Sequence, residues 1–387
     1  MGRTMALYVN PGMLQWAREE SGLTIEAAAK KIGVPPARLI RWEEGSELPT
    51  IPQLRKMASV YHRPTAIFYL NSPPPRLEMP DFRRLKSPVD FPPSPELILE
   101  IRKIHQRREA AIMLAEFGPQ YSWDFVGSIK DMSDPERHAE DIRSLLGIEN
   151  GFLKGVRNDY DSFNRWRSAV ESLGILVFLL RGVPVEEMRG LAIGKKPYPV
   201  IAVNRKDSPR ARTFTLIHEL CHVMMGESTI CDIEEDGNQF NPNAKEVFCN
   251  HVAGAVLVPR TALLESPTVR KHERGRERWT DAELGKLGSE FHVSKEVILR
   301  RLLILGRTTH EFYGWMAEQW RARPTEAKSG GRETVPERVV RVVGPRFVDL
   351  LMTAHSEGAI TLDDISELLD MKLKHLDAVE VLLMKGA

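Results

Sequence analysis

Hydrophobic residues recur at helical spacing through most of the chain. The positions Leu97, Ile101, Ile104 and Ala111 predict one long amphipathic helix over residues 96–117. Shorter helices are expected over 24–32, 35–44, 159–173, 211–226 and 243–257. Residues 281–305 are expected to form a helix, a turn and a second helix, and 345–384 a set of amphipathic helices. The pattern therefore predicts a mostly helical chain.

The hydrophobic pattern changes between residues 175 and 204. Three short apolar runs, each bounded by Gly, Pro or Asn, predict strands over 175–180, 190–194 and 199–204. Helices surround these runs on both sides in the sequence. A small sheet within a mostly helical chain places the protein in the α+β class.

Proline-rich and polar segments divide the chain. Residues 72–95 are dense in proline, which disfavours helix, and are predicted to form an extended linker. A second linker is expected over 322–337, which is polar and contains a Gly pair. These boundaries give a helical domain at 10–71, a central domain at 96–321 that includes the helical pair at 281–305, and a C-terminal helical module at 338–387.

The composition is that of an ordinary globular protein, with 42% hydrophobic and 28% charged residues. Lys plus Arg number 54 and Asp plus Glu 53, which excludes a polybasic nucleic-acid coat and limits nucleic-acid contacts to a local patch. Three cysteines cannot form a disulfide framework. The first residues lack a signal-peptide pattern, and the longest apolar run, 175–180, is too short to span a bilayer. We therefore expect a soluble, cytoplasmic protein of two or three domains without a membrane partner.

The strongest chemical signal is the sequence His-Glu-Leu-Cys-His at residues 218–222. On a helix, His218 and His222 lie one turn apart on the same face, where their imidazoles can bind one Zn²⁺. Glu219 projects near that face and can take a proton from a water molecule that the metal activates. Two histidines in a buried helix also occur in structural roles, but burying both without a metal is costly. The pattern therefore predicts a catalytic zinc site.

A third protein ligand is needed for a site that keeps one position open for catalysis. The downstream candidates are acidic residues and one histidine: Asp232, Glu234, Glu235, Asp236, Glu246 and His251. Residues 230–238 are predicted to form a solvated loop, whereas Glu246 begins an apolar helix that can pack on the first. Glu246 is therefore preferred, although spacing alone leaves His251 open. A structural zinc bound by Cys231 and Cys249 is a minor alternative, since Cys249 is expected to fill the core.

These residues resemble the ImmA/IrrE family of bacterial zinc metallopeptidases. The resemblance is carried by Thr213-Phe214-Thr215-Leu216-Ile217-His218-Glu219-Leu220-Cys221-His222, by Glu246-Val247-Phe248-Cys249-Asn250 and by Leu257-Val258-Pro259, and it is dense over 160–260. It implies a zincin-like, gluzincin-type domain with His218, His222 and Glu246 as zinc ligands and Glu219 as general base. Cys221 and Cys249 stand where the family usually has Gly and Ala, which removes no ligand.

The resemblance also implies a regulatory endopeptidase. Family members of the best-known kind cleave helix-turn-helix repressors and thereby derepress stress-response, mobile-element or phage genes, so the expected partner is such a protein substrate. Two alternatives stay open. One is a DNA-binding regulator whose metal site is structural or non-catalytic, and the other is a protease that cuts its own N-terminal domain or the linker at 72–95. A homodimer is among the oligomeric states that the sequence leaves open.

Residues 13–70 resemble the Xre, or Cro/C1-type, helix-turn-helix domain. The resemblance is carried by Leu23-Thr24, Ala29, Ile32-Gly33-Val34, residues 39–45, Pro49-Thr50 and Leu54. Such a domain inserts its second motif helix into the major groove. Here that helix starts with Pro, Pro and Ala at 35–37, where polar base-reading side chains are common. Arg38 and Arg41 are the candidate DNA contacts, and the domain is interpreted either as a DNA reader or as a protein-docking module.

The helical pair at 281–305 also resembles a helix-turn-helix, with Ser294 as a helix N-cap. Its simpler interpretation is a helical hairpin that packs on the peptidase domain. The C-terminal segment is interpreted as a small interaction or sensing module, because none of its residues form a catalytic pattern.

Overall fold

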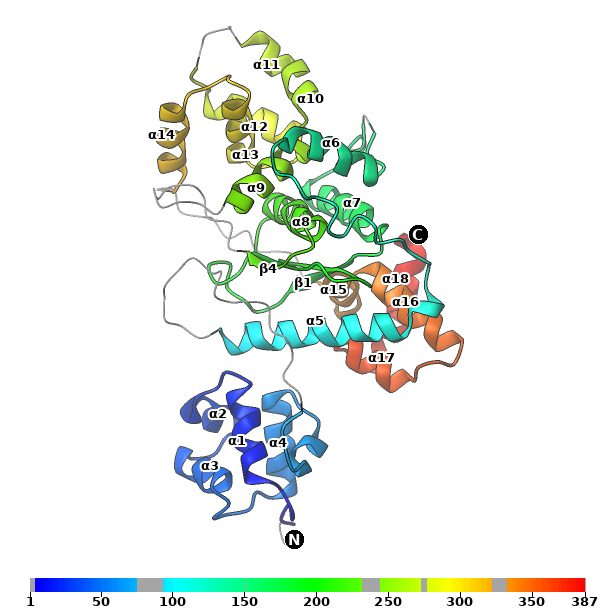
Figure 1. Ribbon diagram of the computed structural model, residues 1–387. Coiled ribbons are helices and arrows are strands. Elements are labelled where there is room, and N and C mark those ends of the chain that lie inside the picture. The colour runs from blue at the N-terminus through cyan, green and yellow to red at the C-terminus, as the bar shows by residue number, and fades with distance from the viewer. Residues whose placement is uncertain are drawn as a thin grey trace. The chain divides into compact units, whose positions relative to one another are not determined.

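The computed structural model describes residues 4–74, 93–149, 151–231, 244–272, 277–321 and 333–386. These residues are mostly helical and include one four-stranded sheet (Figure 1). The α+β class expected from the sequence is confirmed. The described residues fall into two compact units, one ending at residue 105 and the other beginning at residue 106.

The first unit is a small helical domain. It contains α1 (Pro11–Glu19), α2 (Ile25–Ile32), α3 (Pro36–Glu43), α4 (Ile51–Tyr61), the 3-10 helix η1 (Thr65–Tyr69) and the first part of α5 (Pro95–Met113). Thr24 caps α2 by accepting a hydrogen bond from a backbone amide, and Gly33 ends it in the left-handed conformation that glycine tolerates. Trp42 and Tyr61 are fully buried in its core. The helices predicted over 24–32 and 35–44 are confirmed.

The second unit contains the end of α5 and all later elements. In chain order these are η3 (Ala115–Phe117), α6 (Pro135–Leu145), α7 (Asp159–Glu171), β1 (Leu176–Leu180), β2 (Gly190–Ile193), β3 (Val200–Asn204), α8 (Pro209–Met224), β4 (Ser228–Cys231), α9 (Ala244–Leu257), α10 (Arg260–Glu265), α11 (Pro267–Lys271), α12 (Asp281–Glu290), α13 (Lys295–Ile304), α14 (His310–Arg321), α15 (Val335–Val343), α16 (Pro345–Ser356), α17 (Leu362–Leu369), η4 (Leu373–His375) and α18 (Leu376–Gly386). The long helix predicted over 96–117 ends earlier, at Met113, and a separate 3-10 turn follows it.

The sheet has the strand order β1-β3-β2-β4. Strands β1 and β3 are parallel, with Leu176 opposite Val200, whereas β2 is antiparallel to both β3 and β4. The three predicted strands are confirmed, but β4 was not predicted. The predicted loop at 230–238 is wrong at its first two residues, which belong to β4, and its remaining residues lie outside the described part of the chain. A four-residue edge strand has too little alternation to be recognised before its pairing with β2 is known.

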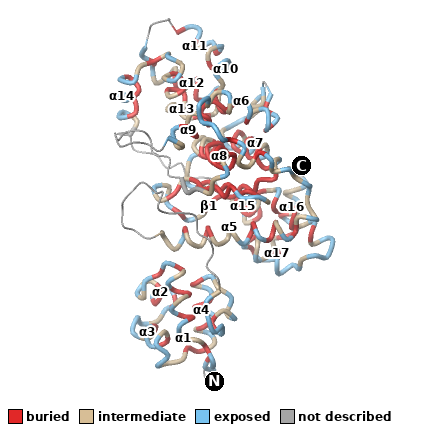
Figure 2. The backbone as a smooth tube through the Cα atoms, in the orientation of Figure 1, coloured by how far each residue is buried: buried red, intermediate tan, exposed pale blue. Residues whose placement is uncertain are grey.

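Helices cover both faces of the sheet. All residues of β1, β2 and β3 are buried. Helix α8 packs on β2 and β3 and α7 on β1, while α15 contacts β1 from the opposite face (Figure 1). Buried residues are concentrated in the strands and in α8, as Figure 2 shows. Helix α8 therefore lies between the sheet and α9, in the interior of this unit.

The C-terminal helices complete the second unit. Helix α15 begins at Val335, ahead of the predicted start at residue 338, because Thr334 and Glu337 form a capping box there. It packs on β1 and on α18. The linkers predicted at 72–95 and 322–337 lie mostly outside the described residues and stay predictions. In the described parts of the chain, every helix falls short of the length and apolarity needed to cross a bilayer.

Candidate metal centre

Helix α8 carries the His-Glu-x-x-His residues in the interior of the second unit. Ser208 caps the helix through its side chain, and Pro209 occupies the first turn, where a missing N–H costs nothing. Beyond this exposed start the apolar residues pack on the sheet. His218, Glu219 and His222 are 0%, 0% and 1% exposed. Such complete burial of three polar side chains requires that they have partners.

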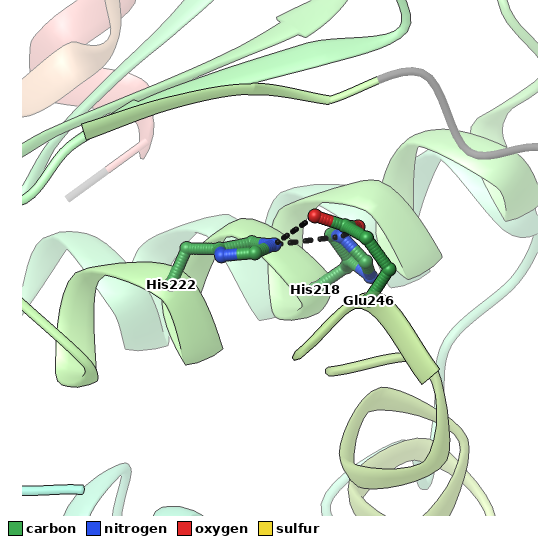
Figure 3. Close-up of side chains that lie close together, drawn as sticks. All are labelled: His218, His222 and Glu246. Carbon is green, nitrogen blue, oxygen red and sulfur yellow. Dashed lines mark hydrogen bonds and ion pairs between the residues drawn. The ribbon is translucent and has the colours of Figure 1, made fainter. Parts of the chain in front are cut away.

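The two imidazoles lie close to each other and to Glu246 of α9 (Figure 3). Their Nε2 atoms are 3.1 Å apart. Glu246 places Oε2 3.2 Å from His218 Nε2 and Oε1 3.4 Å from His222 Nε2. One donor atom from each residue lies within 4.8 Å of the others, and no second cluster of His, Cys, Asp or Glu with this spacing occurs among the described residues. The three side chains therefore form a candidate metal site.

The donor set suits Zn²⁺. Two imidazole nitrogens and one carboxylate are ligands that zinc prefers, and they leave a fourth position open. A hydrogen bond between two Nε2 atoms requires one ring to place its proton there, whereas a shared cation lets all three groups contribute a lone pair. Burial lowers the pKa of His218, which favours the neutral ring that binds a metal. Burial opposes the charge on Glu246, but the hydrogen bonds and charges of the two histidines hold its pKa below the ordinary value.

His251 lies away from this site. Its Nε2 atom is 2.7 Å from Oε1 of Glu136 on α6. The same carboxylate accepts two hydrogen bonds from the buried Arg301 of α13, at 2.5 and 3.0 Å. The structure therefore brings Glu246, and not His251, to the two histidines of α8. The other acidic candidates, Asp232, Glu234, Glu235 and Asp236, lie outside the described residues.

Glu219 lies against Gly190 of β2, a contact that no sequence motif indicates. A Cβ atom added at Gly190 would lie 2.7 Å from Oε1 of Glu219 and 2.5 Å from Cγ2 of Thr215. Gly190 therefore leaves the space that the carboxylate occupies. From the sequence, Gly190 is recognisable only as the first residue of a predicted strand. Its contact with Glu219 joins residues that are far apart in the sequence.

Cys249 lies in the core beside the site, as predicted. It is fully buried, and its Sγ atom is 3.7 Å from Sδ of Met225. Glu227, which follows α8, has its carboxylate beside Nδ1 of His222. Glu227 lies outside the His-Glu-x-x-His pattern, so no motif marks it in the sequence.

The two predicted DNA contacts lie on α3 and share one carboxylate. Arg38 Nε donates to Oε1 of Glu47 at 2.7 Å, and Arg41 Nε donates to Oε2 of the same residue at 3.0 Å. These two hydrogen bonds hold the pKa of Glu47 below its ordinary value. Ile40, between the arginines, is 40% exposed. The surface of α3 therefore combines paired guanidinium groups with apolar side chains.

The helical pair α12–α13, predicted at residues 281–305, packs on α9, the helix that carries Glu246. Helix α13 contacts α9, and Arg301 lies against Gly254 while its Nε donates to the carbonyl oxygen of Val258. Ser294 caps α13, as predicted. These contacts favour the simpler interpretation of the pair as a hairpin on the peptidase domain.

Comparison with protein families gives two matches. Residues 170–303 match the IrrE N-terminal-like domain, a peptidase family, and residues 14–68 match the helix-turn-helix family. The first range contains His218, Glu219, His222 and Glu246, and the second contains both arginines of α3. Comparison with curated proteins gave no match, and neither did comparison with solved structures. The central part of this chain is therefore similar to the IrrE-like peptidase family over residues 170–303, and a helix-turn-helix match precedes it, which is the domain order that the sequence predicted.

Proposed function

We propose that the protein is a zinc-dependent regulatory endopeptidase that cleaves a helix-turn-helix repressor. In this way it would control transcription of stress-response, mobile-element or phage-related genes. The observation that carries the proposal is the convergence of His218, His222 and Glu246 beside the buried Glu219. The peptidase family match supports the reaction class. The choice of substrate rests on what is common in the family.

In this proposal the chain's own residues hold the metal and move the proton. His218, His222 and Glu246 would bind Zn²⁺ and leave one position open for substrate and water. When bound, the ion polarises the scissile carbonyl and makes a water molecule more acidic. Glu219 takes a proton from the attacking water and delivers it to the leaving amine. Its place against β2 restricts the carboxylate to a small volume, so little ordering is needed during the reaction.

We propose DNA contact through Arg38 and Arg41 as the role of the N-terminal domain. The helix-turn-helix match supports it, and access to DNA implies a cytoplasmic location. Protein docking is the competing role, because both arginines are paired with Glu47 and Ile40 is exposed between them. If Glu219 is not catalytic, the protein is instead a DNA-binding regulator with a non-catalytic metal site.

The substitution Glu219→Gln tests the proposal. Wild-type and variant chains would be co-expressed with each repressor encoded nearby, and the fragments identified by mass spectrometry. We expect cleavage by the wild type only, with equal zinc content in both proteins, because glutamine cannot accept the proton. Regulation that survives in the variant would support the non-catalytic alternative. An intact 43.9 kDa chain after long incubation with zinc would count against self-cleavage.

A further inference from the structure

Glu227 connects the two helices that carry the candidate metal ligands. Its Oε2 atom lies 3.3 Å from Nδ1 of His222, at the end of α8. Its Oε1 atom accepts a hydrogen bond from Nζ of Lys245 on α9. Lys245 directly precedes Glu246 in the first turn of that helix. One carboxylate therefore bridges a ligand on α8 and the residue beside a ligand on α9.

The backbone fixes the position of Glu227. Its N–H donates to the carbonyl oxygen of His222, and its carbonyl oxygen accepts from the N–H of Gly194, both at 3.0 Å. A Cβ atom at Gly194 would collide with that carbonyl oxygen, so a glycine is needed for this approach. The Glu227 side chain is 15% exposed. The backbone of Glu227 is thus held by the end of α8 and by Gly194, which directly follows β2, and its side chain is largely buried.

The contact at Nδ1 determines which nitrogen of His222 can bind a metal. A carboxylate accepts a hydrogen bond, so the proton of the neutral ring belongs on Nδ1. Nε2 then keeps its lone pair, and Nε2 is the atom that faces His218 and Glu246. Lys245 supplies a positive charge to the other oxygen of Glu227 and fixes the rotation of the carboxylate. Such supporting contacts usually alter metal affinity by about 10–100-fold.

We propose that Glu227 and Lys245 are positioning residues for the metal centre. Glu227 sets the tautomer and orientation of His222. Lys245 acts through Glu227 and ties the first turn of α9, where Glu246 lies, to the end of α8. This inference rests on the proposed function, since it takes His218, His222 and Glu246 to be metal ligands.

The test is zinc affinity of the full chain, measured by competition with a chromophoric chelator. E227A should bind zinc about 10–100-fold more weakly than the wild type. E227Q should lose less, because its amide oxygen can still accept from Nδ1, and K245M should lose a few-fold. The double variant E227A/K245M should bind no more weakly than E227A, because Lys245 acts through Glu227. K295M is the matched control, since Lys295 pairs with Asp281 in another part of the unit and should keep wild-type affinity.

Thermal unfolding of the metal-free proteins separates positioning from folding. The variants should unfold at the wild-type temperature without zinc and show a smaller gain when zinc is added. Wild-type zinc affinity in E227A would overturn the proposal, and fully additive losses in the double variant would overturn the role of Lys245. If E227A does not fold, the comparison of E227Q, K245M and their double variant decides in the same way. A wild-type chain that binds no zinc would refute the proposed function itself.

Discussion

Replacing Gly190 with alanine tests whether the space beside Glu219 is required for catalysis. The added Cβ would lie 2.5 Å from Cγ2 of Thr215 and 2.7 Å from Oε1 of Glu219. Non-bonded carbon atoms prefer separations of about 3.5–4.0 Å, so one side must move by about 1 Å. Thr215 is buried and β-branched, and therefore has little freedom to rotate away. The added methyl group is therefore expected to displace the Glu219 side chain and the backbone of β2.

We expect G190A to lower kcat/KM for repressor cleavage by about 100-fold, which is the usual cost of misplacing a catalytic group by about 1 Å. Zinc content should stay at the wild-type level, because the three atoms nearest to the added methyl group belong to Thr215 and Glu219 and not to His218, His222 or Glu246. The free energy of unfolding should fall by about 1–3 kcal/mol through overpacking. Cleavage would be followed by mass spectrometry, metal content by elemental analysis and stability by urea denaturation.

The control is G314A on α14. Apart from its chain neighbours and the backbone of its own helix, no atom of the described residues lies within 4 Å of the Cβ that this substitution adds, and the position is exposed. Alanine favours a helix over glycine by about 1 kcal/mol, so G314A should cleave normally and be equally or slightly more stable. Wild-type cleavage by G190A, at wild-type zinc content, would refute the placement of Glu219 as the general base against β2.

Three further outcomes are expected. Chelation should abolish cleavage and lower the midpoint of thermal unfolding, and added Zn²⁺ should restore both, because a ligand that binds only the folded chain stabilises it. E47Q should free Arg38 and Arg41 to contact phosphates and should therefore strengthen DNA binding. The slope of log affinity against log salt concentration should become steeper by an amount equivalent to up to about two phosphate contacts. An unchanged slope in a binding titration would favour protein docking. E136Q should lower the free energy of unfolding at pH 7 by about 3 kcal/mol, because the buried Arg301 loses its charged partner. The lower end of the usual range applies, since the Glu136 side chain is 33% exposed. Burial opposes the charge on Glu136, but His251 and Arg301 hold its pKa at about 2, against an ordinary value of 4.5. Because folding lowers the pKa of Glu136, its ionised carboxylate stabilises the folded protein at pH values above about 4.5. The difference in free energy of unfolding between wild type and E136Q should therefore shrink as the pH falls from about 4.5 through 2. A pH series of denaturation curves in which the two proteins do not converge would contradict this assignment.

Much of the fold follows from local pattern. The three central strands are short apolar runs with clear boundaries, and α8 combines a Ser208 cap, an N-terminal proline and an apolar interior. Strand β4 is different, because it exists through its pairing with β2 and has no distinctive pattern of its own. The early start of α15 depends on a capping box between Thr334 and Glu337, whose sequence signal lies inside the segment predicted as a linker.

The sequence alone determined that His218 and His222 share one face of a helix, with Glu219 beside them, because that geometry depends only on the four-residue spacing. It favoured Glu246 as the third ligand, but residue spacing alone left His251 open. These two residues are five positions apart on α9, so their side chains point about 140° apart, and only one can face α8. Tertiary packing made the choice: the apolar face of α9 packs on α8 with Glu246 toward the two imidazoles, and His251 meets Glu136 and Arg301. Glu227, Gly190 and Gly194 likewise acquire their places near the site only through contacts between segments that the fold brings together.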